Sequence, residues 1–343
     1  MEFRPIPKGK GIRDLYRAAD GQPASDDPSK ERTATAETAA VEPDQFEVRD
    51  PKYRMSDVIL PEATRDQITV LLSRIRNHDL IYHQWGLVEV DPIGQSKAVN
   101  FYGPPGTGKS MLAEALASEL GLRVLDVSYA EIESKYVGDT PKKIRAVFRA
   151  VHQATPSPVL LFFDEADAIL GRRMTNVTQA ADHSVNVSRA VMLKELDLAK
   201  GIVVFATNLA RNIDAAFVRR IMQHVPVPLP DEPGRFRIWE RMITSRVPGR
   251  EAVDWAALAA RSEGLSGGDI RNAVVLALAR VAERFGLEQV VRTSDLEQAI
   301  KHVRQAKKAI GRRRREPRAW HTTIDRYTFD SGAESNGESD ASS

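Results

Sequence analysis

The sequence predicts an α/β fold, in which a parallel sheet carries helices on both faces and a smaller all-helical domain follows. Between about Lys52 and Pro230, short β-rich runs alternate with helical segments such as MLAEALASEL and PKKIRAVFRAVHQ. That alternation is the order of a parallel sheet whose strands are joined by helical crossovers. The runs expected to form strands are AVNFY, RVLDV, VLLFFD, IVVFA and VPVPL.

After Pro230 the β pattern stops, and the helical segments EPGRFRIWERMITSR, DWAALAARSE, SGGDIRNAVVLALARVAERFG and SDLEQAIKHVRQAKKAI follow. Asp254 and Ser266 stand at the start of two of them and are expected N-caps, because their side chains can accept hydrogen bonds from the first free amides. We therefore expect a large α/β domain at 51–230 and a small helical domain at 231–310.

Both ends of the chain are predicted to be disordered. From about Asp20 to Asp50 the sequence is rich in Ala, Thr, Pro, Asp and Glu without an apolar period, a composition that cannot offset the entropy lost on ordering. The other end is basic at RRRREPR and then acidic and Ser-rich at GAESNGESDASS. We expect a disordered arm at 1–50 and a disordered basic-then-acidic tail at 311–343.

The composition excludes several classes of protein. With 42% apolar residues in 343, the chain can bury a large core. Its 49 Lys and Arg against 47 Asp and Glu give a net charge of +2, so no strong overall field attracts nucleic acid or anionic lipid. The lack of cysteine excludes disulfides and thiolate chemistry. No run approaches the roughly 20 apolar residues of a membrane span and the N-terminal stretch lacks an export signal, so we expect no membrane partner and a cytoplasmic location.

A phosphate-binding loop is the most specific motif in the sequence. GPPGTGKS satisfies G-x-x-x-x-G-K-[ST], directly between the strand AVNFY and the helix MLAEALASEL. Its backbone N–H groups can surround a β-phosphate, the Lys ammonium can reach the β and γ oxygens, and the Ser hydroxyl can bind Mg²⁺. We therefore expect ATP and Mg²⁺ as cofactors. The residues expected to contact them are Gly103, Pro104, Pro105, Gly106, Thr107, Gly108, Lys109, Ser110 and Met111.

A pair of carboxylates follows the strand VLLFF, in the order Asp164, Glu165, Ala166, Asp167. Asp164 is expected to bind the magnesium shell, and Glu165 is expected to polarise the attacking water. On its own, an apolar strand that ends in Asp-Glu is more often a solvated strand end. The phosphate loop in the same chain favours the catalytic interpretation.

Together, GPPGTGKS, FFDEAD and the later ATN resemble the AAA family of ATPases over roughly Asp57 to Arg280. The resemblance implies a five-stranded P-loop NTPase sheet domain followed by a small helical lid. In that family a polar residue at the end of the next strand senses the γ-phosphate and positions the water, and Asn208 in VVFATN matches it. Without the resemblance, an Asn between a strand and a loop would be interpreted as a turn residue.

The resemblance implies further nucleotide contacts at both ends of the matching region. GLSGGDI is similar to the second sensor region of the family, where small residues let a helix approach the nucleotide, and Gly267 and Gly268 match it. Most relatives carry Ala at the second position. MSDVIL corresponds to the segment whose backbone reads adenine, which implies contacts from Asp57, Val58 and Ile59.

The segment IDAAFVRRIMQHVPVPLPD resembles the one from which the family places arginine fingers into a neighbouring site. Arg219 and Arg220 match, and the resemblance leaves open which of them acts. An arginine donated in trans stabilises charge on the transferring phosphoryl group and makes hydrolysis depend on assembly. The resemblance therefore implies that the chain assembles into a homo-oligomer, specifically a hexamer. Two solvated arginines at a helix end are the alternative.

A candidate pore loop lies in ESKYVGDT. Lys135 to Gly138 is similar to the aromatic-hydrophobic-glycine loop with which protein-translocating AAA rings grip substrate, which assigns Tyr136 and Val137 to substrate contact. An ordinary half-buried loop aromatic is the alternative. The insert RRMTNVTQAADHSVN stands where a second pore loop would lie, with Arg172, Arg173 and His183 facing either the channel or solvent.

These patterns predict a ring ATPase that hydrolyses ATP to remodel, unfold or disassemble polypeptide substrates by threading, with an adaptor protein as a further partner. A nucleic-acid loader or translocase, suggested by the P-loop fold and the run Arg312 to Arg315, is one alternative, and a nucleotide-gated scaffold is another. The zinc-peptidase motif H-E-x-x-H is absent from the sequence, so we expect no peptide cleavage. Proteasome-type rings bind their protease chamber through a C-terminal hydrophobic residue followed by tyrosine. The end SDASS lacks that pair, so we expect no protease chamber as a partner.

Overall fold

The structure is a computed structural model that describes residues 46–91, 96–133, 139–153, 158–171, 180–199, 201–208, 213–284, 286 and 289–311. The chain divides into two compact units, residues 1–303 and 304–343. The fold described below is that of the first unit, and its last helix, Thr293–Gly311, continues into the second. The predicted boundary between sheet domain and helical domain, at 230/231, lies inside this first unit and stays a prediction.

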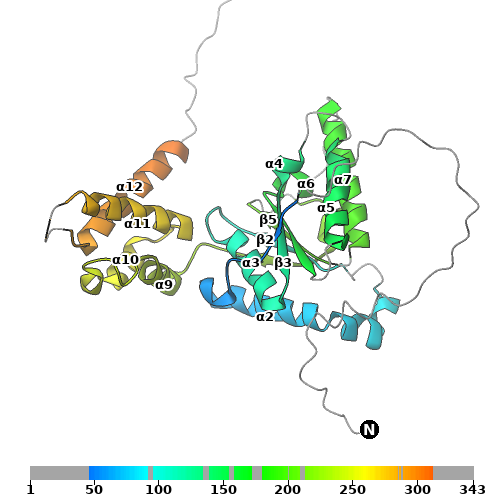
Figure 1. Cartoon of the computed structure of the whole chain (residues 1–343), viewed down its shortest axis with the longest axis horizontal. Helices are drawn as coiled ribbons and strands as arrows, with labels where there is room; N and C mark the ends of the chain where they lie inside the picture. Colours follow the sequence, from blue (N-terminus) through cyan, green and yellow to red (C-terminus); the bar gives the residue numbers. More distant parts are fainter. Residues whose placement is uncertain are drawn as a thin grey trace, which may run out of the picture. The chain divides into compact units, whose positions relative to one another are not determined.

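Within the described residues, six strands form one sheet in the order β1-β3-β4-β5-β2-β6 (Figure 1). All neighbouring strands are parallel except β1, which is antiparallel to β3. The α/β fold with a parallel sheet that the sequence predicts is therefore confirmed, and the antiparallel β1 was not predicted. The strands are β1 (Val48–Arg49), β2 (Ala98–Tyr102), β3 (Arg123–Ser128), β4 (Val159–Asp164), β5 (Ile202–Thr207) and β6 (Ile221–Pro226).

The two edges of the sheet differ from the sequence prediction. The resemblance implies five strands, whereas β1 adds a sixth, which lies within the residues assigned to the disordered arm. The expected strand VPVPL is wrong in position, because β6 ends at Pro226. β6 lies at the edge of the sheet and pairs only with β2 among the described strands, which explains why it can carry polar residues. The prolines at its end have no amide N–H to donate, so the hydrogen-bond ladder with β2 does not continue through them.

Helices cover both faces of the sheet (Figure 1). One face packs against α2 and α3, and the other packs against α4 to α7. The helices of this part of the chain are α2 (Glu62–Arg76), α3 (Lys109–Leu120), α4 (Tyr129–Ile132), α5 (Asp139–Gln153), α6 (Asp167–Leu170), α7 (Ala180–Leu198) and α8 (Ala215–Val218). Shorter turns are the 3-10 helices η2 (Met55–Asp57) and η4 (Leu87–Glu89) and a π-helical turn, η3 (Leu80–Gln84).

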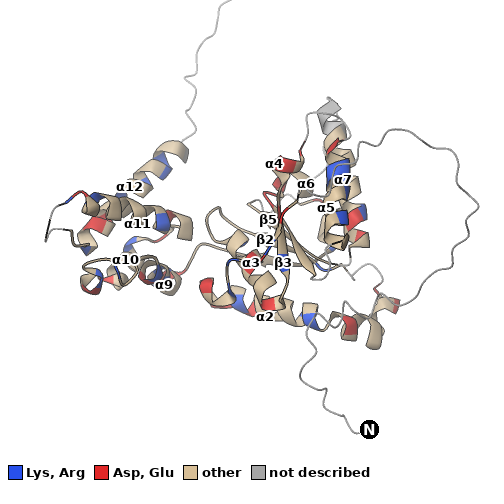
Figure 2. Ribbon diagram, viewed as in Figure 1, with Lys and Arg blue, Asp and Glu red and all other residues tan. Residues whose placement is uncertain are grey.

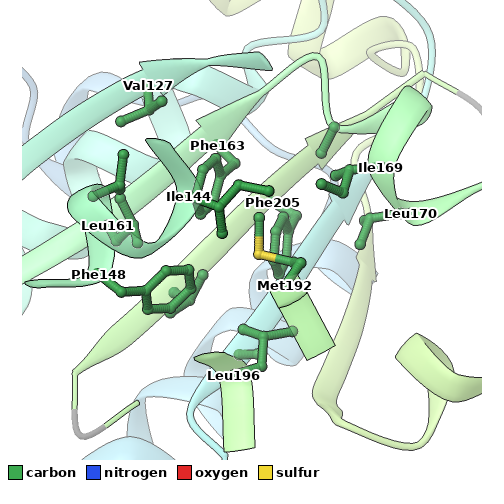
Figure 3. Close-up of a cluster of buried hydrophobic side chains, with 14 of the residues drawn as sticks. Val127, Ile144, Phe148, Leu161, Phe163, Ile169, Leu170, Met192, Leu196 and Phe205 are labelled. Carbon is green, nitrogen blue, oxygen red and sulfur yellow. The ribbon is translucent and has the colours of Figure 1, made fainter. Parts of the chain in front are cut away.

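Alternation along the central strands explains the two covered faces. In β4, Leu161 and Phe163 point to the cluster beneath α5 and α7, whereas Leu160 and Phe162 point to the cluster beneath α2 and α3. Figure 3 shows the first of these clusters, in which Phe163 stacks on Phe205 with ring centroids 5.5 Å apart. Because these strands are buried on both faces, they read as continuous apolar runs in the sequence.

The helical domain has an apolar cluster of its own, centred on the fully buried Trp239. Its helices are α9 (Glu232–Met242), η5 (Arg250–Ala252), α10 (Trp255–Arg261), α11 (Gly267–Ala282) and α12 (Thr293–Gly311). Both predicted N-caps are confirmed, since Asp254 accepts from Ala257 N at 2.9 Å and Ser266 accepts from Asp269 N at 3.2 Å. α9 is shorter than its predicted segment.

Basic and acidic residues alternate along the ribbons of the described helices, in line with the nearly balanced composition (Figure 2). Among the helices formed by the described residues, none combines the length and the apolar character needed to span a bilayer.

Candidate nucleotide-binding site

The loop between β2 and α3 is a tight turn that only glycine can build at two positions. At Gly103, φ is +154° and an added Cβ would lie 2.1 Å from the Val227 carbonyl oxygen. At Gly106, φ is +74° and an added Cβ would lie 2.8 Å from Ser266 Oγ. Thr107 Oγ1 closes the turn by donating to the Pro104 carbonyl at 2.9 Å. The loop is thus fixed in shape and leads directly into the N-terminus of α3.

Lys109 is buried at the start of α3, and its ammonium group lies at the centre of the site. Nζ donates to the carbonyl oxygens of Gly103 at 2.9 Å and Pro104 at 3.0 Å, and to Asn208 Oδ1 at 2.8 Å. Burial lowers the pKa of Lys109, although the nearby carboxylates of Asp164 and Asp167 act in the opposite direction. The cation is therefore oriented by carbonyl groups of the loop and by the side chain of Asn208, the residue after β5.

The other predicted loop residues lie in sequence on either side of Lys109. Pro104 and Pro105 are exposed, Gly108 has φ of +96° before the helix, and Met111 is half-buried in the first turn of α3. Ser110 is exposed, and its Oγ donates to Asp164 Oδ2 at 2.9 Å. The structure therefore brings the predicted hydroxyl and carboxylate together.

The acidic pair follows β4 directly. Asp164 Oδ1 accepts a hydrogen bond from the Glu165 amide at 2.8 Å. Among the described residues, Glu165 is the only non-glycine residue with a positive φ, at 52°. A non-glycine residue in this region is strained by about 1–3 kcal/mol, and such strain is common at functional sites.

Asn208 directly follows β5 and lies beside the loop. Its side chain accepts from Lys109, and its amide N–H donates to both carboxylate oxygens of Asp167, at 3.0 and 3.2 Å. No role is predicted for Asp167 from the sequence. Its spacing of three residues after Asp164 is the signal that could have indicated a second carboxylate at the same edge of the sheet.

The N-terminus of α11 reaches the phosphate loop. Gly268 N donates to the Gly106 carbonyl at 2.9 Å, and an added Cβ on Gly268 would lie 3.3 Å from Gly106 Cα. An added Cβ on Gly267 would lie 3.5 Å from the same carbonyl oxygen. Both predicted glycines therefore stand where the helix approaches the loop closely.

The predicted adenine segment lies between two apolar clusters. Val58 packs against the cluster beneath α2 and α3, whereas Ile59 packs against the cluster of the helical domain. Asp57 pairs with Arg241 of α9, a partner that sequence analysis missed.

The two adjacent arginines after α8 have different environments. Arg219 is exposed. Arg220 is half-buried and forms a two-pronged ion pair with Asp197 at the end of α7, with Nε to Oδ1 at 2.7 Å and Nη2 to Oδ2 at 3.0 Å. The hydrogen bonds to Asp197 raise the pKa of Arg220, although burial acts against them. Arg220 is therefore anchored within its own chain.

A cavity of about 840 Å³ adjoins the acidic pair on the side of β1 and α4. It was not predicted, because β1 was assigned to the arm. Arg49 of β1 lines it and pairs with Glu114 of α3 at 2.8 Å and with Asp126 of β3 at 3.4 Å. Burial raises the pKa of Asp126, and Asp164 adds to the shift, although Arg49 opposes it.

Several predicted residues lie outside the described part of the chain. These are the candidate pore residues Lys135, Tyr136, Val137 and Gly138, Arg172 and Arg173 of the second candidate loop, and the basic run Arg312 to Arg315. His183 belongs to α7, which begins at Ala180.

The geometry fits a magnesium nucleotide. The backbone turn and Lys109 form a cradle for phosphate at a helix N-terminus. Ser110 and Asp164 supply a hydroxyl and a carboxylate, which are the oxygen ligands that Mg²⁺ prefers when it also binds phosphate. Such a site can activate a phosphoanhydride toward a water held by Glu165 and Asn208.

Comparison with known proteins agrees with this geometry. Residues 99–229 match the family described as ATPase family associated with various cellular activities (AAA). The chain is 34% identical to 26S proteasome subunit RPT4 of Saccharomyces cerevisiae over 272 residues, which cover 76% of this chain and 60% of the relative.

Two other relatives match shorter stretches. The ATPase family gene 2 protein of Saccharomyces cerevisiae is 36% identical over 227 residues, covering 64% of this chain and 27% of the relative. The proteasome-activating nucleotidase of Methanopyrus kandleri is 36% identical over 181 residues, covering 51% of this chain and 41% of the relative. The chain thus spans from 27% to 60% of the length of the three relatives.

Proposed function

Since this chain belongs to the AAA family of ATPases, we propose that it hydrolyses ATP with Mg²⁺ and uses the energy to remodel polypeptides within a ring of identical subunits. One observation carries the proposal. Lys109, Asp164 and Asn208, from three separate elements, meet around the phosphate loop. An assembly of cation, carboxylate and amide at a phosphate cradle suits phosphoryl transfer to water.

Each residue has a distinct role in the proposed reaction. The backbone of the loop and Lys109 bind the phosphates, and Ser110 and Asp164 would hold the magnesium ion. Bound Mg²⁺ supplies positive charge that neutralises the phosphate oxygens. Glu165 accepts a proton from the attacking water, and Asn208 orients that water toward the γ-phosphate.

The decisive measurement for hydrolysis uses Glu165→Gln. We expect it to bind ATP with nearly unchanged affinity and to release phosphate at least about a hundredfold more slowly, because the amide cannot accept a proton. Glu240→Gln, on the exposed side of α9, is the matched control and should behave as wild type. Wild-type turnover by Glu165→Gln would overturn the proposed catalytic role.

An arginine from the adjacent subunit completes the site in this proposal. The exposed Arg219 is the donor, because Arg220 is already engaged with Asp197 in its own chain. A guanidinium placed beside the γ-phosphate stabilises the charge that develops during transfer. Arg220 acts as a positioning residue that fixes the turn from which Arg219 projects.

A polypeptide is the substrate class that the comparisons favour. Two of the relatives are named for the proteasome, whose substrates are proteins. These names do not favour the alternative of a nucleic-acid loader or translocase. Tyr136 and Val137 are proposed to grip an extended chain by packing of the aromatic ring. The test is unfolding of a tagged substrate by Tyr136→Ala, which should lose unfolding while keeping basal hydrolysis. Retained unfolding would contradict the threading proposal. The hexamer, the adaptor, the cytoplasmic location and the lack of a protease chamber stay predictions.

A further inference from the structure

The segment from Met55 to Leu60 joins the sheet domain to the helical domain through its side chains. Val58 and the buried Leu60 pack into the cluster beneath α2 and α3. Ile59, between them, packs against the cluster around Trp239. Two neighbouring side chains of one short segment therefore pack against two different cores, so a movement of the helical domain acts directly on this backbone.

Arg241 of α9 holds the same segment through two polar contacts. Its Nη1 donates to the Ser56 carbonyl at 3.0 Å, and its Nη2 pairs with Asp57 Oδ1. The other oxygen of Asp57 accepts from the Arg54 amide at 2.8 Å and closes the η2 turn. One planar guanidinium thus fixes a carbonyl and a carboxylate that are adjacent in the chain, a geometry that Lys cannot reproduce.

These contacts set the charge state of Asp57. The Arg54 amide, followed by the side chain of Arg241, lowers the pKa of Asp57. Both contacts therefore favour the ionised carboxylate over the protonated acid. The Arg241 side chain is 50% exposed, and exposed ion pairs contribute little to global stability. Its contacts act on the local order of the segment and not on the fold as a whole.

The helical domain also touches the phosphate loop, but through a different element. Gly268 N of α11 donates to the Gly106 carbonyl. The helical domain thus contacts two parts of the proposed nucleotide site, the phosphate loop through α11 and the segment at 55–60 through α9. These contacts can be separated by mutation, because no residue takes part in both.

We propose that Arg241 is a positioning residue for the base of the nucleotide. It holds the Ser56–Ile59 backbone in the conformation that receives adenine, and it makes affinity for the base depend on the helical domain. This inference rests on the proposed function and on the adenine contact that the family resemblance implies for Asp57, Val58 and Ile59. It concerns recognition of the base, and the triphosphate is bound independently of Arg241.

The test compares ligands with and without a base. Fluorescent ADP is displaced by ADP or by inorganic tripolyphosphate in wild type, Arg241→Ala and Arg241→Lys. We expect Arg241→Ala to weaken ADP roughly five- to tenfold and to leave tripolyphosphate unchanged, because a hydrogen bond to a charged group is lost only at the base segment. Arg241→Lys should recover only part of the loss, because an ammonium cannot bridge both acceptors. The control is Arg237→Ala, which removes an exposed arginine of the same helix and should match wild type.

A double-mutant cycle that combines Arg241→Ala with Asp57→Asn tests whether Arg241 acts through the Asp57 carboxylate. If Arg241 acts through Asp57, the double variant should bind ADP no more weakly than Arg241→Ala alone. Unchanged ADP affinity in Arg241→Ala, an equal loss for tripolyphosphate, or an equal loss in Arg237→Ala would each overturn the inference. If wild type bound neither ligand, the proposed function itself would fail, which is a different result.

Discussion

Arg219 and Arg220 are neighbours in sequence but belong to different interactions. Arg219 is exposed at the end of α8, whereas Arg220 is bound in two-pronged fashion to Asp197 of α7. We predict that Arg219→Ala lowers ATP turnover of the assembled protein by about a thousandfold or more, the range expected for loss of an arginine donated in trans. The measurement is steady-state phosphate release at saturating ATP.

The same assay distinguishes the role of Arg220. Because Arg220 acts through Asp197 in this account, Asp197→Asn and Arg220→Ala should give similar, smaller losses of turnover, and their combination should add little. If Arg220 were the donor, Asp197→Asn would leave turnover intact while Arg220→Ala abolished it. That pattern would reverse the assignment of the two arginines.

Glu114 of α3 is buried and binds the N-terminal strand. Its carboxylate accepts from Arg49 at 2.8 Å and from the Lys52 amide at 2.7 Å. Burial acts to raise the pKa of Glu114, but these hydrogen bonds outweigh it and the pKa is lowered. Removing the charge leaves Arg49 with a weaker partner, so we predict that Glu114→Gln costs about 1–3 kcal/mol of the free energy of unfolding.

The lowered pKa of Glu114 determines how its contribution to the free energy of unfolding depends on pH. A carboxylate with a lowered folded pKa stabilises fully above its unfolded pKa, near 4.3, and the contribution is lost as pH falls through the lower folded value. Urea denaturation from pH 7 to pH 3 should therefore show wild type and Glu114→Gln converging at the acid end. A constant difference between them would contradict the assigned ion pair.

These residue partners could not be predicted from sequence. Arg241 and Asp57 are 184 positions apart, and Arg220 and Asp197 are 23 apart. Nothing in a charge pattern identifies which carboxylate a given arginine meets after folding. Lys109 and Ser110 could be predicted from the phosphate-loop motif, and Asp164 from the apolar strand that ends in Asp-Glu. These two motifs fix both the residue types and the elements on which the residues stand.

At the scale of elements, a polar chain crosses three strands inside the sheet. Thr207 Oγ1 of β5 lies 3.4 Å from Asn100 Oδ1 of β2, and Asn100 Nδ2 lies 3.3 Å from His224 Nδ1 of β6. Asn100 is fully buried. Burial lowers the pKa of His224, although the Val218 backbone acts in the opposite direction, which suits a neutral ring that accepts from Asn100.

This chain predicts a non-additive mutational pattern. Asn100→Leu removes the donor to a half-buried His224 and should cost about 1–3 kcal/mol of stability, because a desolvated acceptor is left unpaired. Asn100→Leu combined with His224→Val makes the contact between β2 and β6 apolar on both sides, and we expect it to recover the part of the loss that comes from His224, while the Thr207 hydroxyl still lacks its Asn100 acceptor. Chemical denaturation of the single and double variants measures the pattern. A double variant less stable than both single variants would contradict it.

The central strands could be predicted and the edge strands could not. β2 and β4 match their predicted runs, because strands buried on both faces are mostly apolar, and Asn100 is the buried polar exception in β2. β1 is only two residues long and β6 carries polar residues at the edge, so neither gives a continuous apolar signal.

At the scale of the whole molecule, Lys109, Asp164 and Asn208 lie around the phosphate loop, while Arg219 follows α8 and is open to solvent. In the proposed mechanism each subunit supplies a nearly complete site and lends one arginine to its neighbour. Turnover per subunit should therefore rise with protein concentration as rings form, and dilution should lower it. Concentration-independent turnover would count against assembly as part of the mechanism.

Mixing two inactive variants tests this exchange most directly. Arg219→Ala retains its own Glu165, and Glu165→Gln retains its own Arg219, so adjacent subunits of the two kinds form complete sites. We predict that an equal mixture hydrolyses ATP well above the mean of the separate variants, whereas replacing Glu165→Gln by the double variant Arg219→Ala/Glu165→Gln gives no gain. A mixture no more active than that mean, with assembled rings present, would contradict hydrolysis completed by the neighbouring subunit.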